Sequence, residues 1–128
     1  MCFSILIVDD DDTNLLLISK ILQMEGYRTY STNNGAEAIR MIEEYKPDMA
    51  ILDVMMPKMD GYELCQRFRQ APIHSNIPIV MLTAMTSASD REKALSAGAT
   101  DIWSKPFDLD ALRQRIHDLL VTKDTPTP

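Results

Sequence analysis

The sequence predicts an α/β fold in which a five-stranded parallel sheet is covered by helices on both faces. Short apolar runs alternate five times with segments of helical periodicity. The strongest runs, such as residues 5–8 (ILIV), are apolar without interruption, as expected for strands buried on both faces. The connections are short, which favours consecutive βα units around one sheet.

Each strand is assigned from its own run of residues. The first run is followed by a weaker one at 28–31 and by a second strongly apolar one at 49–52. Pro78 opens the fourth strand, and the fifth is short. The predicted strands are 5–8, 28–31, 49–52, 79–82 and 102–103.

The helices follow from apolar spacing and from stop signals. In the first helix, Leu15, Ile18, Ile21 and Leu22 recur at helical spacing, and Gly26 ends it. Three further helices are predicted at 36–45, 61–70 and 89–97. Asp108 is expected to cap the last helix, whose inner stripe is predicted to be Leu109, Leu112, Ile116 and Leu119.

Length and composition restrict the class of protein. A chain of 128 residues is the usual size of one domain. With 13 basic and 19 acidic side chains the net charge is −6, which argues against nucleic-acid binding by this domain alone. Cys2 and Cys65 are too few for a disulfide framework, and His74 and His117 are isolated. No apolar stretch is long enough for a membrane span and no signal peptide is visible, so a cytoplasmic protein is expected.

Polar side chains stand where the strands end. Asp9 and Asp10 follow the first strand, Asp53 the third, Thr83 the fourth, and Lys105 the fifth. Ligands of open α/β sheets bind beyond the carboxyl ends of the strands. Three acids, a hydroxyl and an ammonium group are therefore expected at one edge.

The chemistry of this set points to phosphoryl transfer assisted by a metal. Clustered carboxylates repel one another, and a divalent cation removes that repulsion. Oxygen ligands without His or Cys suit Mg²⁺, or Mn²⁺ in its place. Thr83 and Lys105 are suited to holding phosphoryl oxygens. Asp53, in the middle of the sheet, is the natural nucleophile for an acyl phosphate.

The other acids near the site are interpreted mainly as helix caps. Carboxylates at helix N-termini accept hydrogen bonds from free N–H groups and suit the helix dipole. One of Asp11 and Asp12 is expected to cap the first helix, and Asp60 the third. Asp101 is expected to be a solvated or capping residue.

Four motifs resemble the receiver domain of bacterial two-component response regulators. They are Asp9-Asp10, "ILDVMMPKMDG" at 51–61, "MLTA" at 81–84 and "SKPF" at 104–107, and the resemblance covers about residues 4–121. It implies a flavodoxin-like doubly wound sheet of order 2-1-3-4-5 with five helices. It also implies that Asp53 accepts phosphate from a histidine kinase or phosphotransfer protein. Asp10, Asp9 through water, and the Met55 carbonyl would bind Mg²⁺, Thr83 and Lys105 would contact the phosphoryl group, and the Lys105–Pro106 bond would be cis.

The resemblance carries further expectations. Phosphorylation would change the surface of the fourth helix, fifth strand and fifth helix, controlling a downstream effector or fused output domain and promoting a dimer. Many receivers carry Tyr or Phe three residues before the lysine, where this chain has Ile102, and Trp103 is expected to pack in the core. Residues 1–121 would form the receiver and 122–128 a disordered tail or the start of a linker. The chain would be a stand-alone receiver or part of a longer protein, with no external turnover substrate.

An enzyme is the alternative hypothesis. Asp9, Asp11 and Thr13 also match D-x-D-x-T, which is similar to the first motif of haloacid dehalogenase-type phosphatases. Asp9 would then be the nucleophile. This hypothesis leaves Asp53 and the loop with Pro57 and Gly61 unexplained. The aspartate that becomes phosphorylated distinguishes the two.

Overall fold

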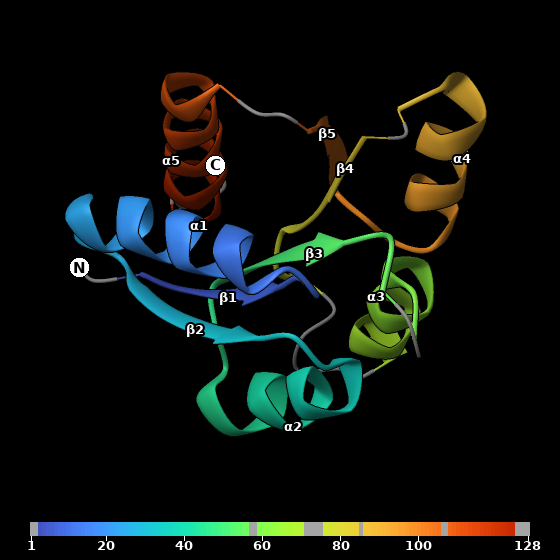
Figure 1. Cartoon of the computed structure of the whole chain (residues 1–128), viewed down its shortest axis with the longest axis horizontal. Coiled ribbons are helices and arrows are strands. Elements are labelled where there is room, and N and C mark those ends of the chain that lie inside the picture. The colour runs from blue at the N-terminus through green and yellow to red at the C-terminus, as the bar shows by residue number, and fades with distance from the viewer. Residues whose placement is uncertain (1–2, 57–58, 71–75, 85, 106–107, 125–128) are drawn as a thin grey trace.

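The structure, a computed structural model, describes residues 3–56, 59–70, 76–84, 86–105 and 108–124. Five strands alternate with five helices (Figure 1). The elements are β1 (Ser4–Val8), α1 (Asp12–Met24), β2 (Arg28–Thr32), α2 (Gly35–Tyr45), β3 (Met49–Asp53), α3 (Gly61–Gln70), β4 (Ile79–Thr83), α4 (Ala88–Ser96), β5 (Asp101–Ser104) and α5 (Leu109–Asp124). Within these ranges no helix has the length and apolarity needed to cross a membrane.

The strands form one parallel sheet of order β2-β1-β3-β4-β5. This confirms the predicted flavodoxin-like order. The order reverses between β1 and β3, so the chain leaves these two neighbouring strands in opposite directions across the sheet. A crevice at the carboxyl ends of such strands is where open α/β sheets bind ligands.

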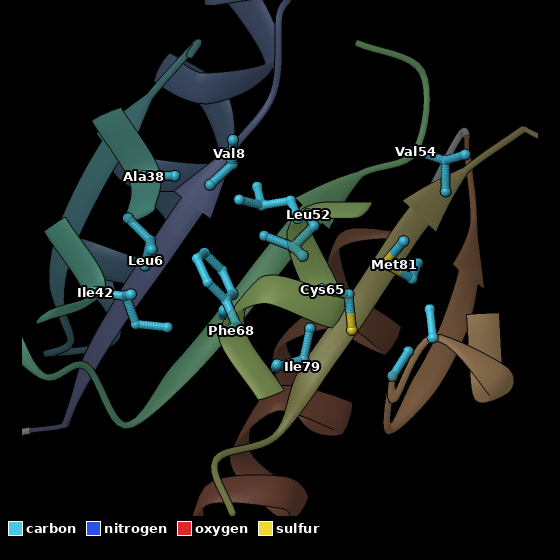
Figure 2. Packing of buried hydrophobic residues seen from close by; sticks show 14 of the residues in the cluster. Leu6, Val8, Ala38, Ile42, Leu52, Val54, Cys65, Phe68, Ile79 and Met81 are labelled. Atoms are coloured by element: carbon cyan, nitrogen blue, oxygen red, sulfur yellow. The ribbon is translucent and has the colours of Figure 1, made fainter. Parts of the chain in front are cut away.

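Alternate residues of the strands belong to two separate hydrophobic cores, one on each face of the sheet. On one face, Leu6, Leu52 and Met81 pack with residues of α2, α3 and α4 such as Ile42 and Phe68 (Figure 2). The other face packs against α1 and α5. Ile102 belongs to the first core and Trp103 to the second, which confirms that the two side chains point to opposite faces and that Trp103 is a core residue.

The predicted helix caps are confirmed. The Asp11 carboxylate accepts the Thr13 N–H at 2.9 Å, so Asp11 is the N-cap of α1. The Asp60 carboxylate accepts the Glu63 N–H at 2.8 Å at the start of α3. Asp108 accepts the Asp110 N–H at 3.0 Å before α5.

Three details of the C-terminal part differ from the prediction. Leu109, the first residue of α5, is 40% exposed. Leu119 is only partly buried, and Leu120, which the prediction left out, is fully buried with Leu112 and Ile116. Helix α5 continues to Asp124 and so includes 122–124, which were assigned to the tail. Asp101 is not merely solvated: its carboxylate accepts hydrogen bonds from the Trp103 indole N–H at 3.0 Å and from Arg91 at 3.1 Å.

Candidate functional site

The predicted polar side chains come from the carboxyl ends of four strands. Asp53 and Thr83 are the last residues of β3 and β4, while Asp9 directly follows β1 and Lys105 directly follows β5. Since the sheet is parallel, all four lie at one edge. The site is thus assembled from residues up to 96 positions apart in the chain.

Three carboxylates gather at this edge. One oxygen each of Asp9, Asp10 and Asp53 lies within 4.8 Å of the other two. Asp9 is 2% exposed and Asp53 5% exposed, whereas Asp10 faces solvent. The cluster therefore has two buried members and one open side.

Lys105 bridges the two buried carboxylates. Its Nζ lies 3.0 Å from Asp9 Oδ2 and 3.3 Å from Asp53 Oδ1. Burial alone would lower the pKa of Lys105, but the hydrogen bond and charge of Asp9, together with the charge of Asp53, raise it above its ordinary value. Lys105 is therefore a fixed positive charge next to Asp53.

Burial and like charge both act on Asp53. Burial, reinforced by the charge of Asp9, raises the pKa of Asp53 from 3.8 to about 6, although Lys105 opposes the shift. The Met55 N–H donates to Asp53 Oδ1 at 3.3 Å. The carboxylate is thus ionised at neutral pH but poorly stabilised by the protein alone.

Gly61 allows the backbone to turn closely behind Asp53. A Cβ atom at Gly61 would lie 2.4 Å from the Asp53 carbonyl oxygen and 2.9 Å from Val54 Cα. The Gly61 N–H donates to the Val54 carbonyl at 3.0 Å. Only glycine fits between α3 and the end of β3 without moving the backbone that carries Asp53.

Asp9 has partners that the sequence interpretation missed. Its Oδ1 accepts the Asp11 N–H at 2.9 Å, and its Oδ2 lies 3.5 Å from Asn14 Nδ2. The sequence does contain a signal for Asn14, because its amide side chain lies in the first turn of a helix that begins beside the acidic pair. These contacts fix the orientation of the Asp9 carboxylate.

Thr83 is tied to Lys105 through the backbone. The Lys105 N–H donates to the Thr83 carbonyl at 2.8 Å, and Thr83 is paired with Ser104 across β4 and β5. Its side chain is 1% exposed. A movement of the Thr83 backbone would therefore displace the end of β5.

The donor set fits a hard divalent cation. The clustered ligand atoms are carboxylate oxygens, one of the acids is open to solvent, and the site holds an excess of negative charge over Lys105. Mg²⁺ binds through a few carboxylates and keeps several waters. Cys2, Pro57, His74 and the Lys105–Pro106 bond fall on positions outside the described residues.

Comparison with known proteins decides the family. The family model for the response regulator receiver domain matches residues 5–117. The chain belongs to this family. A receiver is a phosphorylatable signalling switch and is not a turnover enzyme of the usual kind. The family match gives the phosphatase alternative no support, and Asp11, which that alternative needs at the site, caps α1.

The similar proteins include response regulators and the receiver domain of a histidine kinase. The receiver is 42% identical over 116 residues to "Response regulator MprA" of Mycobacterium leprae, covering 91% of this chain and 50% of that protein. It is 37% identical over 120 residues to the "DNA-binding dual master transcriptional regulator RpaA" of Synechocystis, covering 94% of this chain and 50% of that protein. The solved receiver domain of a signal transduction histidine kinase from Syntrophus aciditrophicus has a TM-score of 0.87 at 36% identity, covering 98% of this chain and 96% of that one. The chain spans about half the length of the two curated relatives.

Proposed function

We propose that Asp53 is the phosphoryl acceptor of this receiver, with a histidine kinase or phosphotransfer protein as the donor. The observation that carries the proposal is the buried Asp53 carboxylate, which lies within the three-carboxylate cluster and 3.3 Å from Lys105. Asp9 is held at both oxygens, at Oδ1 by the Asp11 N–H and at Oδ2 by Lys105. The Met55 N–H and Lys105 both lie at Oδ1 of Asp53. Asp53 is therefore the carboxylate better placed to react.

The transfer is an in-line displacement at phosphorus. A carboxylate oxygen of Asp53 attacks the phosphorus of the donor while the bond from phosphorus to the donor's leaving nitrogen or oxygen breaks. The product is an acyl phosphate on Asp53, and the leaving group keeps the electron pair of the broken bond. The Met55 N–H and Lys105 Nζ, both directed at Asp53 Oδ1, orient the attacking carboxylate.

Asp9, Asp10 and Asp53, with the Met55 carbonyl, would hold Mg²⁺, and Mn²⁺ is the alternative ion. A bound divalent cation supplies neutralisation of the carboxylates and of the charge on the transferring group. Lys105 and the Thr83 hydroxyl then contact the phosphoryl oxygens. Attack of water on the acyl phosphate would return Asp53 to its free form, so the switch would reset itself.

Phosphorylation acts as a local electrostatic switch. It adds about −1.5 to −2 charge and three acceptor oxygens at Asp53. Lys105 and Thr83 move toward these oxygens, and their shared backbone hydrogen bond passes the movement to the surface of α4, β5 and α5. That surface would control a downstream effector, a fused output domain or a phosphorylation-dependent dimer.

Acetyl phosphate labelling tests the acceptor. With Mg²⁺ the protein should gain one phosphoryl group on Asp53, located by mass spectrometry of its peptides. Asp53→Asn should not be labelled, while Asp60→Asn, which removes an exposed capping carboxylate and keeps a capping side chain, should be labelled like the wild type. Equal labelling of Asp53→Asn, or label on Asp9, would show that the assignment is wrong.

A further inference from the structure

A groove lies between α1 and the edge strand β2, on the side of α1 that faces away from α5. It has a volume of about 630 Å³, within the range of ligand-binding clefts. Hydroxyl groups of Ser19, Thr29 and Ser31 line it, together with the apolar side chain of Leu16 and the carboxylate of Asp12. The groove lies near the edge of the sheet that carries Asp9 and Asp53, but none of the residues proposed for phosphoryl transfer line it.

A buried hydroxyl in this groove lacks a partner. Ser19 is 9% exposed, and within the described part of the chain its Oγ makes no hydrogen bond. Buried hydroxyl groups are normally satisfied, so an unpartnered one that lines a cleft indicates a missing partner. Gln23 does not supply it, because its amide donates to Thr29 Oγ1 at 2.8 Å.

Strand β2 also offers unpaired backbone groups. It lies at the end of the sheet order, and among the described residues it is paired with β1 alone (Figure 1). The Arg28 N–H and the Thr32 carbonyl are directed at β1, through bonds to Phe3 and Asp9. Because successive residues of a strand direct their amide groups to opposite sides, Thr29 and Ser31 present theirs at the open edge.

The two edges of the sheet are protected differently. At β5, Arg91 of α4 forms an ion pair with Asp101, the first residue of the edge strand. β2 has no proline and a single charged residue, Arg28, at its first position. A row of Thr, Tyr and Ser with a free edge suits pairing with another strand.

We propose that β2 and the groove beside α1 bind an extended peptide segment of a partner protein, which adds to the sheet as a further strand. Its backbone pairs with Thr29 and Ser31 at the open edge. On the side of α1, one of its side chains packs on Leu16, which is 66% exposed. A change of the Ser19 rotamer would turn its buried hydroxyl toward the groove, where a second side chain provides the missing hydrogen bond. A basic side chain suits the end of the groove, where Asp12 lies.

Charge favours a separate peptide over a second copy of this chain. Each copy carries a net charge of −6, so two copies repel one another when they approach through their β2 strands. A neutral or basic segment meets no such repulsion. The partner is therefore expected to be an extended, uncharged or basic stretch of another protein.

Selection from a library of short linear peptides of random sequence tests the proposal on the whole chain. Enriched peptides should be extended, with apolar and basic residues, and on binding should slow amide hydrogen exchange at Thr29 and Ser31. Leu16→Lys should weaken the binding of these peptides about tenfold or more. Leu17→Lys should not weaken it, because Leu17 is a 44% exposed neighbour on α1 that does not line the groove.

Three further variants separate backbone pairing from side-chain contacts. Ser31→Pro removes an N–H that faces away from β1 together with the Ser31 hydroxyl, and Ser31→Ala removes the hydroxyl alone. The fold should survive both changes, while peptide binding is lost only in Ser31→Pro. Ser19→Ala should leave stability unchanged or improved and still weaken binding severalfold. Failure to enrich any peptide sensitive to Ser31→Pro, equal effects of the two leucine variants, or a self-association abolished by Ser31→Pro would overturn the proposal.

Discussion

Replacing Asp53 with asparagine should stabilise the protein when divalent cations are removed. In the folded state the ionised Asp53 is buried beside Asp9, and its pKa is raised from 3.8 to about 6. The shift is about two pKa units, and at about 1.36 kcal/mol per unit the ionised form loses up to about 3 kcal/mol of folding free energy. Burial of the asparagine amide has its own cost, so we expect a gain of about 1–3 kcal/mol at neutral pH.

The sign of the pH dependence follows from the raised pKa. Between about pH 4 and pH 6 the folded protein keeps a proton on Asp53 that the unfolded chain has released, so wild-type stability falls as the pH rises through this window. Above it the loss is complete, and below it the carboxyl is neutral in both states. The advantage of Asp53→Asn should therefore be near zero at pH 4, grow through pH 6 and be constant above pH 7.

Thermal or urea unfolding in EDTA at several pH values measures this advantage. A gain of 1 kcal/mol corresponds to roughly 4 °C in melting temperature for a domain of this size. Asp60→Asn is the matched control, because it removes one exposed carboxylate outside the carboxylate cluster and keeps a capping side chain. Mg²⁺ should stabilise the wild type more than Asp53→Asn. A pH-independent gap, or a less stable Asp53→Asn variant at pH 7.5 in EDTA, would refute the reasoning.

Three other changes have defined outcomes. Asp10→Asn should abolish Mg²⁺ binding, measured by calorimetry, and leave the fold intact. Asp12→Asn should change neither Mg²⁺ binding nor the fold, since Asp12 lies in the first turn of α1 and outside the carboxylate cluster. Gly61→Ala should destabilise by about 1–3 kcal/mol and slow labelling by acetyl phosphate, because its Cβ would meet backbone. Beryllium fluoride, a phosphoryl mimic, should shift amide signals of α4 with little rotamer change in the methyl NMR of Ile102, a stiff β-branched side chain; a full rotamer exchange beside an unmoved α4 would contradict this.

The fold was predictable because each element carries its own local signal. Uninterrupted apolar runs mark the buried strands, and the caps at Asp11, Asp60 and Asp108 mark helix starts independently of tertiary contacts. The grouping of Asp9, Asp10 and Asp53 also followed, because parallel strands must deliver their carboxyl ends to one edge. Strand order itself came from the family resemblance, since periodicity does not determine which strands are neighbours.

What escaped prediction depends on tertiary contacts. Periodicity places Leu109 on the same face of α5 as Leu112 and Ile116, but Leu109 is the first residue of the helix and is 40% exposed. Asp101 looked like a surface acid because its partners, Arg91 and the Trp103 indole, approach only after β5 joins the sheet. Asn14 was missed because its contact with Asp9 needs the first turn of α1 in place.

The geometry of Lys105 links the proposed acceptor, Asp53, to the proposed output surface. In the unphosphorylated receiver its ammonium group is shared between Asp9 and Asp53, and its backbone is bonded to Thr83. Phosphorylation at the proposed acceptor would move negative charge from the carboxylate of Asp53 to oxygens farther from β3, and the position of lowest energy for the Lys105 ammonium group would move with it. Because Lys105 directly follows β5 and its N–H is bonded to the end of β4, its displacement would act on both strands. On this proposal, the charge crowding that destabilises the unphosphorylated protein would also allow one added phosphoryl group to rearrange the site.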